Sequence, residues 1–341
     1  MKYEVVVTMP GHFGFSILRR TGPFLIFRWG QLRGVPSLLI RSIKNQRSKI
    51  KNSIAVLSFL PLASAGADPS GVETLLQTGT TELSSRNFEA AKELFGSVIK
   101  ETAPGSEPWA HAVFGAAVCA HHRSPTTQKR VEDAARLYHL LLESVAGSKF
   151  APRAALNLGR LAELRDYYED PVDLEAARNW YRRVIDRWPD LPIAGEATLR
   201  LAATFVQTYD MPEVRHGVDL LETWLTTRDD EPLAAGMWQY LGDIYFYPLA
   251  DHAASLSCYR KGEALGFLDP NNIGTLFWRM AILAERFLED RELAVEYYGK
   301  VIRTGAASGK GYQAQQALER LGAPVPELQL FQPIALTRPP E

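Results

Sequence analysis

The sequence predicts an all-α fold, a right-handed superhelical solenoid of about six antiparallel helix-turn-helix repeats closed by a C-terminal capping helix. Three observations support this prediction. Pairs of small residues recur about every 40 residues between 68 and 322. The apolar residues around these pairs follow a helical spacing of about 3.6 residues. No stretch of 70–322 combines the alternation and the turn residues of a strand hairpin.

Each repeat is anchored by one small residue on its first helix and one on its second. Small residues on facing helices let two backbones approach closely, while bulky apolar residues fill the remaining space. The first anchors are 36, 44, 43, 40 and 39 residues apart. We therefore predict six pairs of repeat-packing residues: Gly79 with Ala91, Gly115 with Ala134, Gly159 with Ala177, Ala202 with Gly217, Gly242 with Ala254, and Ala281 with Ala294.

Breaks between the predicted helices fall where the repeat requires them. Proline, glycine and aspartate cluster between repeats, as in the segment 229–232, DDEP. Longer inserts such as RDYYEDPVDLE lie between the two helices of one repeat, where an insertion costs little. After the sixth repeat, Gly311–Leu321 is predicted to form the capping helix, with Tyr312 among the residues that pack on repeat 6.

The N-terminal region differs in charge from the rest of the chain. Residues 1–53 carry ten Lys or Arg and one acidic residue, whereas the remainder carries 28 basic and 38 acidic residues. An acidic body without clustered Lys and Arg argues against nucleic-acid binding. We expect residues 1–53 to be either a disordered basic extension or the product of a wrongly assigned translation start.

Residues 44–67 have the pattern of a secretory signal peptide. Four basic residues precede a short apolar run that begins at Ile54, and small residues follow at signal-peptidase spacing. The apolar run is too short to span a bilayer. We expect residues 54–67 to contain the apolar segment and the cleavage site, at Ala65 or Ala67. The mature protein would then be exported to the periplasm or secreted, with 323–341 as a proline-rich tail.

No pattern of catalytic, cofactor or metal-binding residues stands out. Cys119 and Cys258, the two cysteines of the chain, are expected to be buried thiols in different repeats. Cys119 and His122 share a helix face, but no zinc-type motif accompanies them. The glycine-rich segment 304–313 lacks the spacing of a phosphate-binding loop. We expect no enzyme activity, no cofactor and no bound metal.

The most regular repeat carries a family resemblance. Trp238, Leu241, Gly242 and Tyr245 follow the pattern W-x2-L-G-x2-Y, and Ala177–Pro189 follows A-x3-Y-x2-V-x4-P. Both patterns resemble the tetratricopeptide repeat, and the resemblance extends over 68–322. The junction 184–202 is similar to that of tetratricopeptide proteins of the bacterial envelope. The resemblance implies a protein-interaction solenoid of an exported bacterial type.

In such a solenoid the first helix of each repeat lines a concave groove. Aromatic and charged side chains there would be the contacts of a partner protein or peptide, since Trp, Tyr and Arg dominate binding energy. The register of the repeats gives these candidate groove residues: Trp109, Arg153, Arg160, Glu163, Glu196, Gln239, Asp243, Phe246, Tyr247, Trp278 and Arg286.

The favoured function is a non-catalytic scaffold that holds a protein or peptide partner in the groove, in assembly or maintenance of the cell envelope. Two alternatives stay open. A metal-binding accessory or catalytic domain would use the cluster around Cys119 and His122. A cytosolic tetratricopeptide regulator would not be exported. The sequence does not identify the partner.

Overall fold

The computed structural model describes residues 16–18, 26–28, 69–164, 172–267, 272–304 and 309–327. The chain divides into two compact units, 1–61 and 62–341. In the first unit, β1 (Ser16–Leu18) pairs antiparallel with β2 (Ile26–Arg28), with Ile17 opposite Phe27. The sequence analysis did not anticipate this strand pair. The predicted cleavage sites Ala65 and Ala67 lie outside the described residues, as does 328–341 of the predicted tail.

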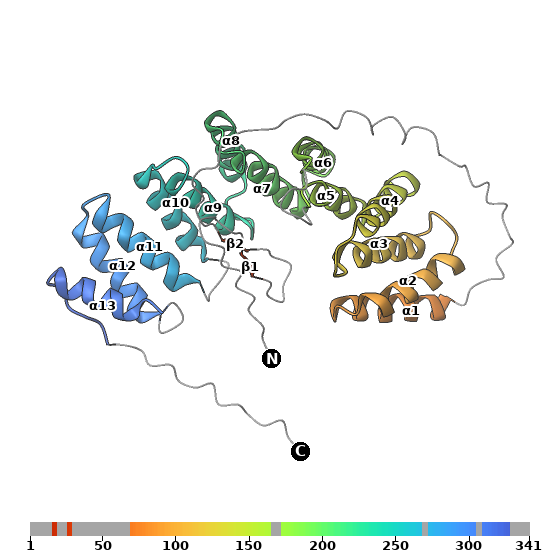
Figure 1. Cartoon of the computed structure of the whole chain (residues 1–341), viewed down its shortest axis with the longest axis horizontal. Coiled ribbons are helices and arrows are strands. Elements are labelled where there is room, and N and C mark those ends of the chain that lie inside the picture. Colours follow the sequence, from red (N-terminus) through yellow and green to blue (C-terminus); the bar gives the residue numbers. More distant parts are fainter. Residues whose placement is uncertain are drawn as a thin grey trace, which may run out of the picture. The chain divides into compact units, whose positions relative to one another are not determined.

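The second unit is an all-α helical-repeat solenoid, as the sequence predicted. Each helix is followed by its antiparallel neighbour in chain order (Figure 1). None of the described helices is long and apolar enough to cross a membrane. The described part of this unit contains thirteen helices: α1 (Pro69–Ser84), α2 (Phe88–Glu101), α3 (Glu107–His122), α4 (Gln128–Ser144), α5 (Ala151–Ala162), α6 (Leu174–Arg187), α7 (Pro192–Val206), α8 (Met211–Thr227), α9 (Ala234–Phe246), α10 (His252–Leu265), α11 (Ile273–Arg286), α12 (Arg291–Arg303) and α13 (Gly311–Arg320).

Local sequence explains where several second helices begin. Asp173, Asp251 and Asp290 each precede a helix and accept a hydrogen bond from the backbone N–H three residues later, at 2.9–3.0 Å. A carboxylate at this position satisfies one of the N–H groups that a helix start leaves unpaired. These three aspartates therefore fix the starts of α6, α10 and α12.

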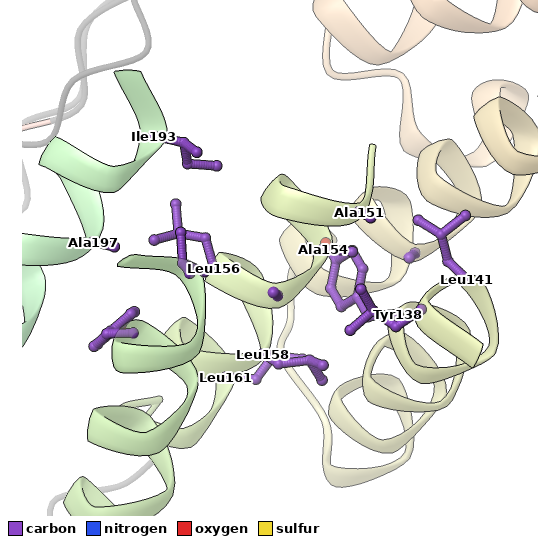
Figure 2. Close-up of a cluster of buried hydrophobic side chains, with 14 of the residues drawn as sticks. Tyr138, Leu141, Ala151, Ala154, Leu156, Leu158, Leu161, Ile193 and Ala197 are labelled. Carbon is purple, nitrogen blue, oxygen red and sulfur yellow. The ribbon is translucent and has the colours of Figure 1, made fainter. Parts of the chain in front are cut away.

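The core lies between the helices of each hairpin and between neighbouring hairpins. In the hairpins of α3 to α7, Tyr138 and Leu141 of α4 lie beside Ala151 and Ala154 of α5 (Figure 2). On the other side of α5, Leu156 packs toward the side chains of α7. Two pairs of first helices also touch, α1 with α3 and α5 with α7. We use the name first-helix surface for the exposed and half-buried side chains of α3, α5, α7, α9 and α11 and of the residues that end these helices.

The structure places most of the predicted anchor residues at close helix contacts. A Cβ atom on Gly159 would lie 2.4 Å from the Tyr181 ring, and one on Gly217 would lie 2.9 Å from the Ala202 carbonyl oxygen. Gly79 and Gly115 both face the Phe95 ring, so Gly115 packs against the preceding hairpin. Six of the predicted alanines have no exposed surface: Ala91, Ala134, Ala177, Ala202, Ala281 and Ala294.

The fifth repeat departs from the predicted pairing by one residue. Ser255, not Ala254, is fully buried, and its hydroxyl donates to the Gly242 carbonyl oxygen at 2.8 Å. Tyr259, four residues further on, packs against Gly242. Ala254 lies at the edge of the contact and is half-buried. The sequence reasoning missed Ser255 because it considered only glycine and alanine as anchors, whereas a hydroxyl bonded to a backbone carbonyl also fits.

The capping helix forms as predicted, with one difference. Ala314, Ala317 and Leu318 of α13 are buried against the last hairpin. Tyr312 is 70% exposed and does not pack there. Tyr312 stands two residues before Ala314, and residues two apart on a helix do not share a face.

Candidate functional site

The predicted groove residues lie on or at the ends of α3, α5, α7, α9 and α11, the first helices of repeats 2 to 6. Their exposure differs widely. Arg153, Tyr247 and Arg286 are exposed. Seven others are half-buried: Arg160, Glu163, Glu196, Gln239, Asp243, Phe246 and Trp278. The first-helix surface therefore carries both protruding and partly buried side chains.

Trp109 departs from the prediction. Only 5% of its surface is exposed, and it belongs to the apolar cluster that also contains Ala151 and Ala154 of α5. Ser106 caps the start of α3, accepting from the Trp109 N–H at 3.4 Å, and this holds the tryptophan in the first turn. Trp109 is thus a packing residue, and its indole does not reach the first-helix surface.

Six side chains of α5 and α7 and their ends form what we call the central polar cluster: Arg153, Asn157, Arg160, Glu163, Glu196 and Arg200. Glu196 joins two of the arginines. Its Oε2 atom lies 3.0 Å from Arg153 Nη1, and its Oε1 atom lies 3.3 Å from Arg200 Nε. The Arg153–Glu196 pair connects α5 to α7, so it fixes side chains of two successive repeats relative to one another, and the Arg200–Glu196 pair lies within α7.

A chain of hydrogen bonds lies beneath this cluster. Asn157 Nδ2 donates to Tyr138 Oη at 3.0 Å, and His121 Nδ1 lies 3.4 Å from the same oxygen. Arg160 Nη1 donates to Asn157 Oδ1 at 3.4 Å. Burial, together with the charges of His122, Arg160 and Arg200, lowers the pKa of His121 to about 3. His121 is therefore neutral at physiological pH.

Glu163 is held by groups from two other helices. The Tyr181 hydroxyl of α6 donates to its carboxylate, and Gln207 at the end of α7 also bonds to it. Burial raises the pKa of Glu163, although Tyr181, Arg200 and Arg160 oppose this. A carboxylate restrained in this way presents a fixed geometry to a ligand.

A second polar cluster is formed by side chains of α9, α10 and α11. Tyr259 Oη donates to Asp243 Oδ1 at 2.6 Å, and Arg279 pairs with the same carboxylate. Arg279 also donates to Tyr259 Oη at 2.8 Å. The Arg279 guanidinium lies 5.8 Å from the Phe246 ring centre and 5.5 Å from that of Tyr247, within cation–π range. A half-buried ring, Phe246, and an exposed ring, Tyr247, thus lie beside a fixed ion pair.

The same arrangement recurs in the last repeat. Tyr298 Oη donates to Glu285 Oε2 at 2.6 Å, and Arg320 of α13 pairs with that carboxylate. The Trp278 ring lies 5.4 Å from the ring of Tyr298. In repeats 3, 5 and 6 a tyrosine of the second helix therefore reaches an acid of the first.

The tyrosines of these pairs were not among the site residues predicted from the sequence, and neither were Arg200, Arg279 and Tyr240. Burial raises the pKa of Tyr240, and the Asp243 and Glu163 carboxylates add to the shift. Tyr240 therefore lies near both polar clusters. The sequence does contain a signal for the tyrosine–acid pairs. In each of these repeats a tyrosine, rather than a leucine, lies four residues after the small anchor residue of the second helix.

The region around Cys119 has a different character. Burial raises the pKa of the Cys119 thiol to about 11, and the residue packs in the apolar core of the first hairpins. The His121 and His122 rings stack at 4.4 Å. Within the described ranges, no three His, Cys, Asp or Glu side chains converge as a metal site requires.

Comparison with known proteins identifies the fold. No protein-family model and no curated protein matches the chain. Among solved structures, the C-terminal part of a TPR repeat-containing protein from Cytophaga hutchinsonii matches with a TM-score of 0.51 and 16% identity, over 72% of this chain and 87% of that one. Pseudomonas aeruginosa pilF matches with a TM-score of 0.48 and 20% identity, over 73% of this chain and 97% of that one. The chain has a tetratricopeptide-like fold.

Proposed function

We propose that the chain is a non-catalytic scaffold that binds a segment of a partner protein along the first-helix surface of repeats 3 to 6. The supporting observation is that this surface carries half-buried charged and aromatic side chains whose positions are fixed by their own hydrogen bonds. Such pre-organisation reduces the entropy lost on binding. Aromatic rings beside charged groups are the usual anchors of a protein-recognition surface.

We further propose that the protein works in the bacterial cell envelope, where it takes part in assembly or maintenance. The support is the basic and apolar pattern of residues 44–67 followed by small residues. N-terminal sequencing of the protein purified from its own host tests export. A mature terminus near 66 or 68 is expected, and an intact N-terminal extension in the purified protein would contradict export.

Site-specific photo-crosslinking tests the binding surface. A photoreactive amino acid at Gln239 or Trp278, in the full chain expressed in its own host, should crosslink to a partner protein. The same amino acid at Arg183, an exposed residue on α6, is the control. Adding Tyr247→Ala should weaken the crosslink from Gln239. Equal crosslinking from all three positions would contradict binding along the first helices.

A further inference from the structure

We propose that Arg160 is the recognition point for a single carboxylate on the bound partner segment, so that the partner is acidic at this place. This inference rests on the proposed function and specifies the chemistry of its ligand. In the central polar cluster, three guanidinium groups face two carboxylates.

The two carboxylates are already engaged. Glu196 is shared by Arg153 and Arg200, at 3.0 and 3.3 Å. Glu163 accepts the Tyr181 hydroxyl. To the described residues, the Arg160 guanidinium makes one hydrogen bond, to Asn157 Oδ1 at 3.4 Å, which is a long contact to a neutral group. Among the described residues, Arg160 takes part in no ion pair.

Comparable arginines of this fold do have acidic partners. Arg279 pairs with Asp243, Arg320 pairs with Glu285, and Arg178 pairs with Glu213 at 2.8 Å. A partly buried guanidinium is costly unless an anion compensates its lost hydration. At Arg160 the described part of the fold supplies the cation without the acid. A carboxylate from a partner would complete the pairing that the other repeats make internally.

The surrounding charges favour a monovalent anion. The central polar cluster has one more positive than negative charge, so one carboxylate neutralises it, whereas a doubly charged phosphate would leave it negative. Burial lowers the pKa of Arg160 and the Arg200 charge lowers it further, although Glu196, Tyr181 and Tyr138 oppose this. An anion beside Arg160 would compensate both the lost hydration and the neighbouring positive charge.

Peptide pools test this proposal with the full chain. Each pool holds fluorescent nine-residue peptides whose central residue is Glu, Gln or phosphoserine, with uncharged residues randomised elsewhere. Binding is measured by fluorescence anisotropy. A charge-assisted hydrogen bond at a partly buried site predicts that the Glu pool binds at least about tenfold more tightly than the Gln pool.

The decisive variant is Arg160→Gln. It should reduce binding of the Glu pool to the level of the Gln pool while leaving the Gln pool unaffected. Arg183→Gln makes the same change of charge on the exposed face of α6 and should keep the Glu preference. Arg160→Lys keeps the charge and should retain part of the preference. Circular dichroism of each variant verifies that it is folded.

The other outcomes are distinct. Equal binding of the Glu and Gln pools to the unmodified chain would overturn this proposal and leave the scaffold function standing. Tighter binding of the phosphoserine pool than of the Glu pool would overturn the assignment of a single carboxylate. Failure of every pool to bind would overturn both this proposal and the peptide-binding function.

Discussion

Tyr259 donates its hydroxyl hydrogen to the Asp243 carboxylate across 2.6 Å, from the second helix of the fifth hairpin to the first. The ring of the same tyrosine packs against Gly242. One side chain therefore closes the helix contact with its ring and orients a surface acid with its hydroxyl. Tyr181 does the same for Glu163, and Tyr298 for Glu285. Packing within each hairpin thus determines how its candidate binding residues are presented.

Replacing Tyr259 by Phe tests this double role. The ring contact with Gly242 stays, while Asp243 loses a buried donor, so we expect a loss of about 1–2 kcal/mol in the free energy of unfolding. Urea unfolding followed by circular dichroism measures it. Tyr312→Phe, at a 70% exposed position, is the control and should change stability by less than about 0.5 kcal/mol. Equal effects of the two changes would show that the Tyr259 hydroxyl contributes nothing.

Replacing Gly159 or Gly96 by alanine should change the free energy of unfolding in opposite directions. At Gly159 a Cβ atom would lie 2.4 Å from the Tyr181 ring, so Gly159→Ala should destabilise by roughly 1–3 kcal/mol. At Gly96, inside α2, nothing lies within 4 Å of such an atom. Gly96→Ala should therefore stabilise by about 0.5–1 kcal/mol, because alanine loses less backbone entropy in a helix. Thermal melts of both variants decide this, and a stabilising Gly159→Ala would contradict the close contact.

The solenoid was predictable from sequence because each close helix contact demands a small residue at a fixed place in the repeat. The small residues therefore recur periodically even where the repeat is degenerate, and their spacing predicted helices from about 69 to 320. The spacing does not determine which of two adjacent small residues makes the contact. In the fifth repeat Ala254 and Ser255 are both small, and only the hydrogen bond to Gly242 distinguishes them.

The polar contacts of the surface could not be derived in the same way. Glu163 follows its anchor Gly159 by four residues, Asp243 follows Gly242 by one, and each reaches a tyrosine of the second helix. Which acid a hydroxyl reaches depends on how the two helices cross, and spacing along one helix does not contain that information. The burial of Trp109 has the same origin, because it depends on the neighbouring hairpin.

A pair of valine substitutions tests the corrected register. Ser255 is fully buried, so Ser255→Val removes the bond to the Gly242 carbonyl and adds a methyl group to a filled contact. We expect a loss of roughly 2–4 kcal/mol. Ala254→Val makes a similar change at a half-buried position and should cost less than about 1 kcal/mol. Urea midpoints compare the two, and the greater loss at Ala254 would restore the sequence-based pairing.

Both thiols should be unreactive in the folded protein. Burial raises the pKa of Cys119 to about 11 and that of Cys258 to about 12, so the reactive thiolate is scarce at neutral pH. A thiol-specific chromogenic reagent should label neither cysteine within minutes in buffer and both in urea. Rapid labelling in buffer would show that at least one of the two surrounding cores is open, and Cys119→Ala would identify which.

Stability should fall in acid through His121. Its pKa in the folded protein is about 3, below the ordinary value of 6.5, because burial and the nearby His122, Arg160 and Arg200 disfavour its charged form. The unfolded chain therefore takes up a proton first as pH drops below 6.5. The contribution of neutral His121 to the free energy of unfolding is therefore fully present above pH 6.5. It declines by up to about 1.4 kcal/mol per pH unit toward pH 3.

The difference between the unmodified protein and His121→Gln isolates this contribution from the carboxylates that also titrate in acid. Urea unfolding between pH 7 and about pH 4.5 should show a shallower decline for the variant. His139→Gln changes an exposed histidine and should follow the unmodified protein. Parallel declines for His121→Gln and the unmodified protein would mean that His121 can take up its proton without leaving the fold. That result would contradict the assignment of a neutral, buried His121 beneath the central polar cluster.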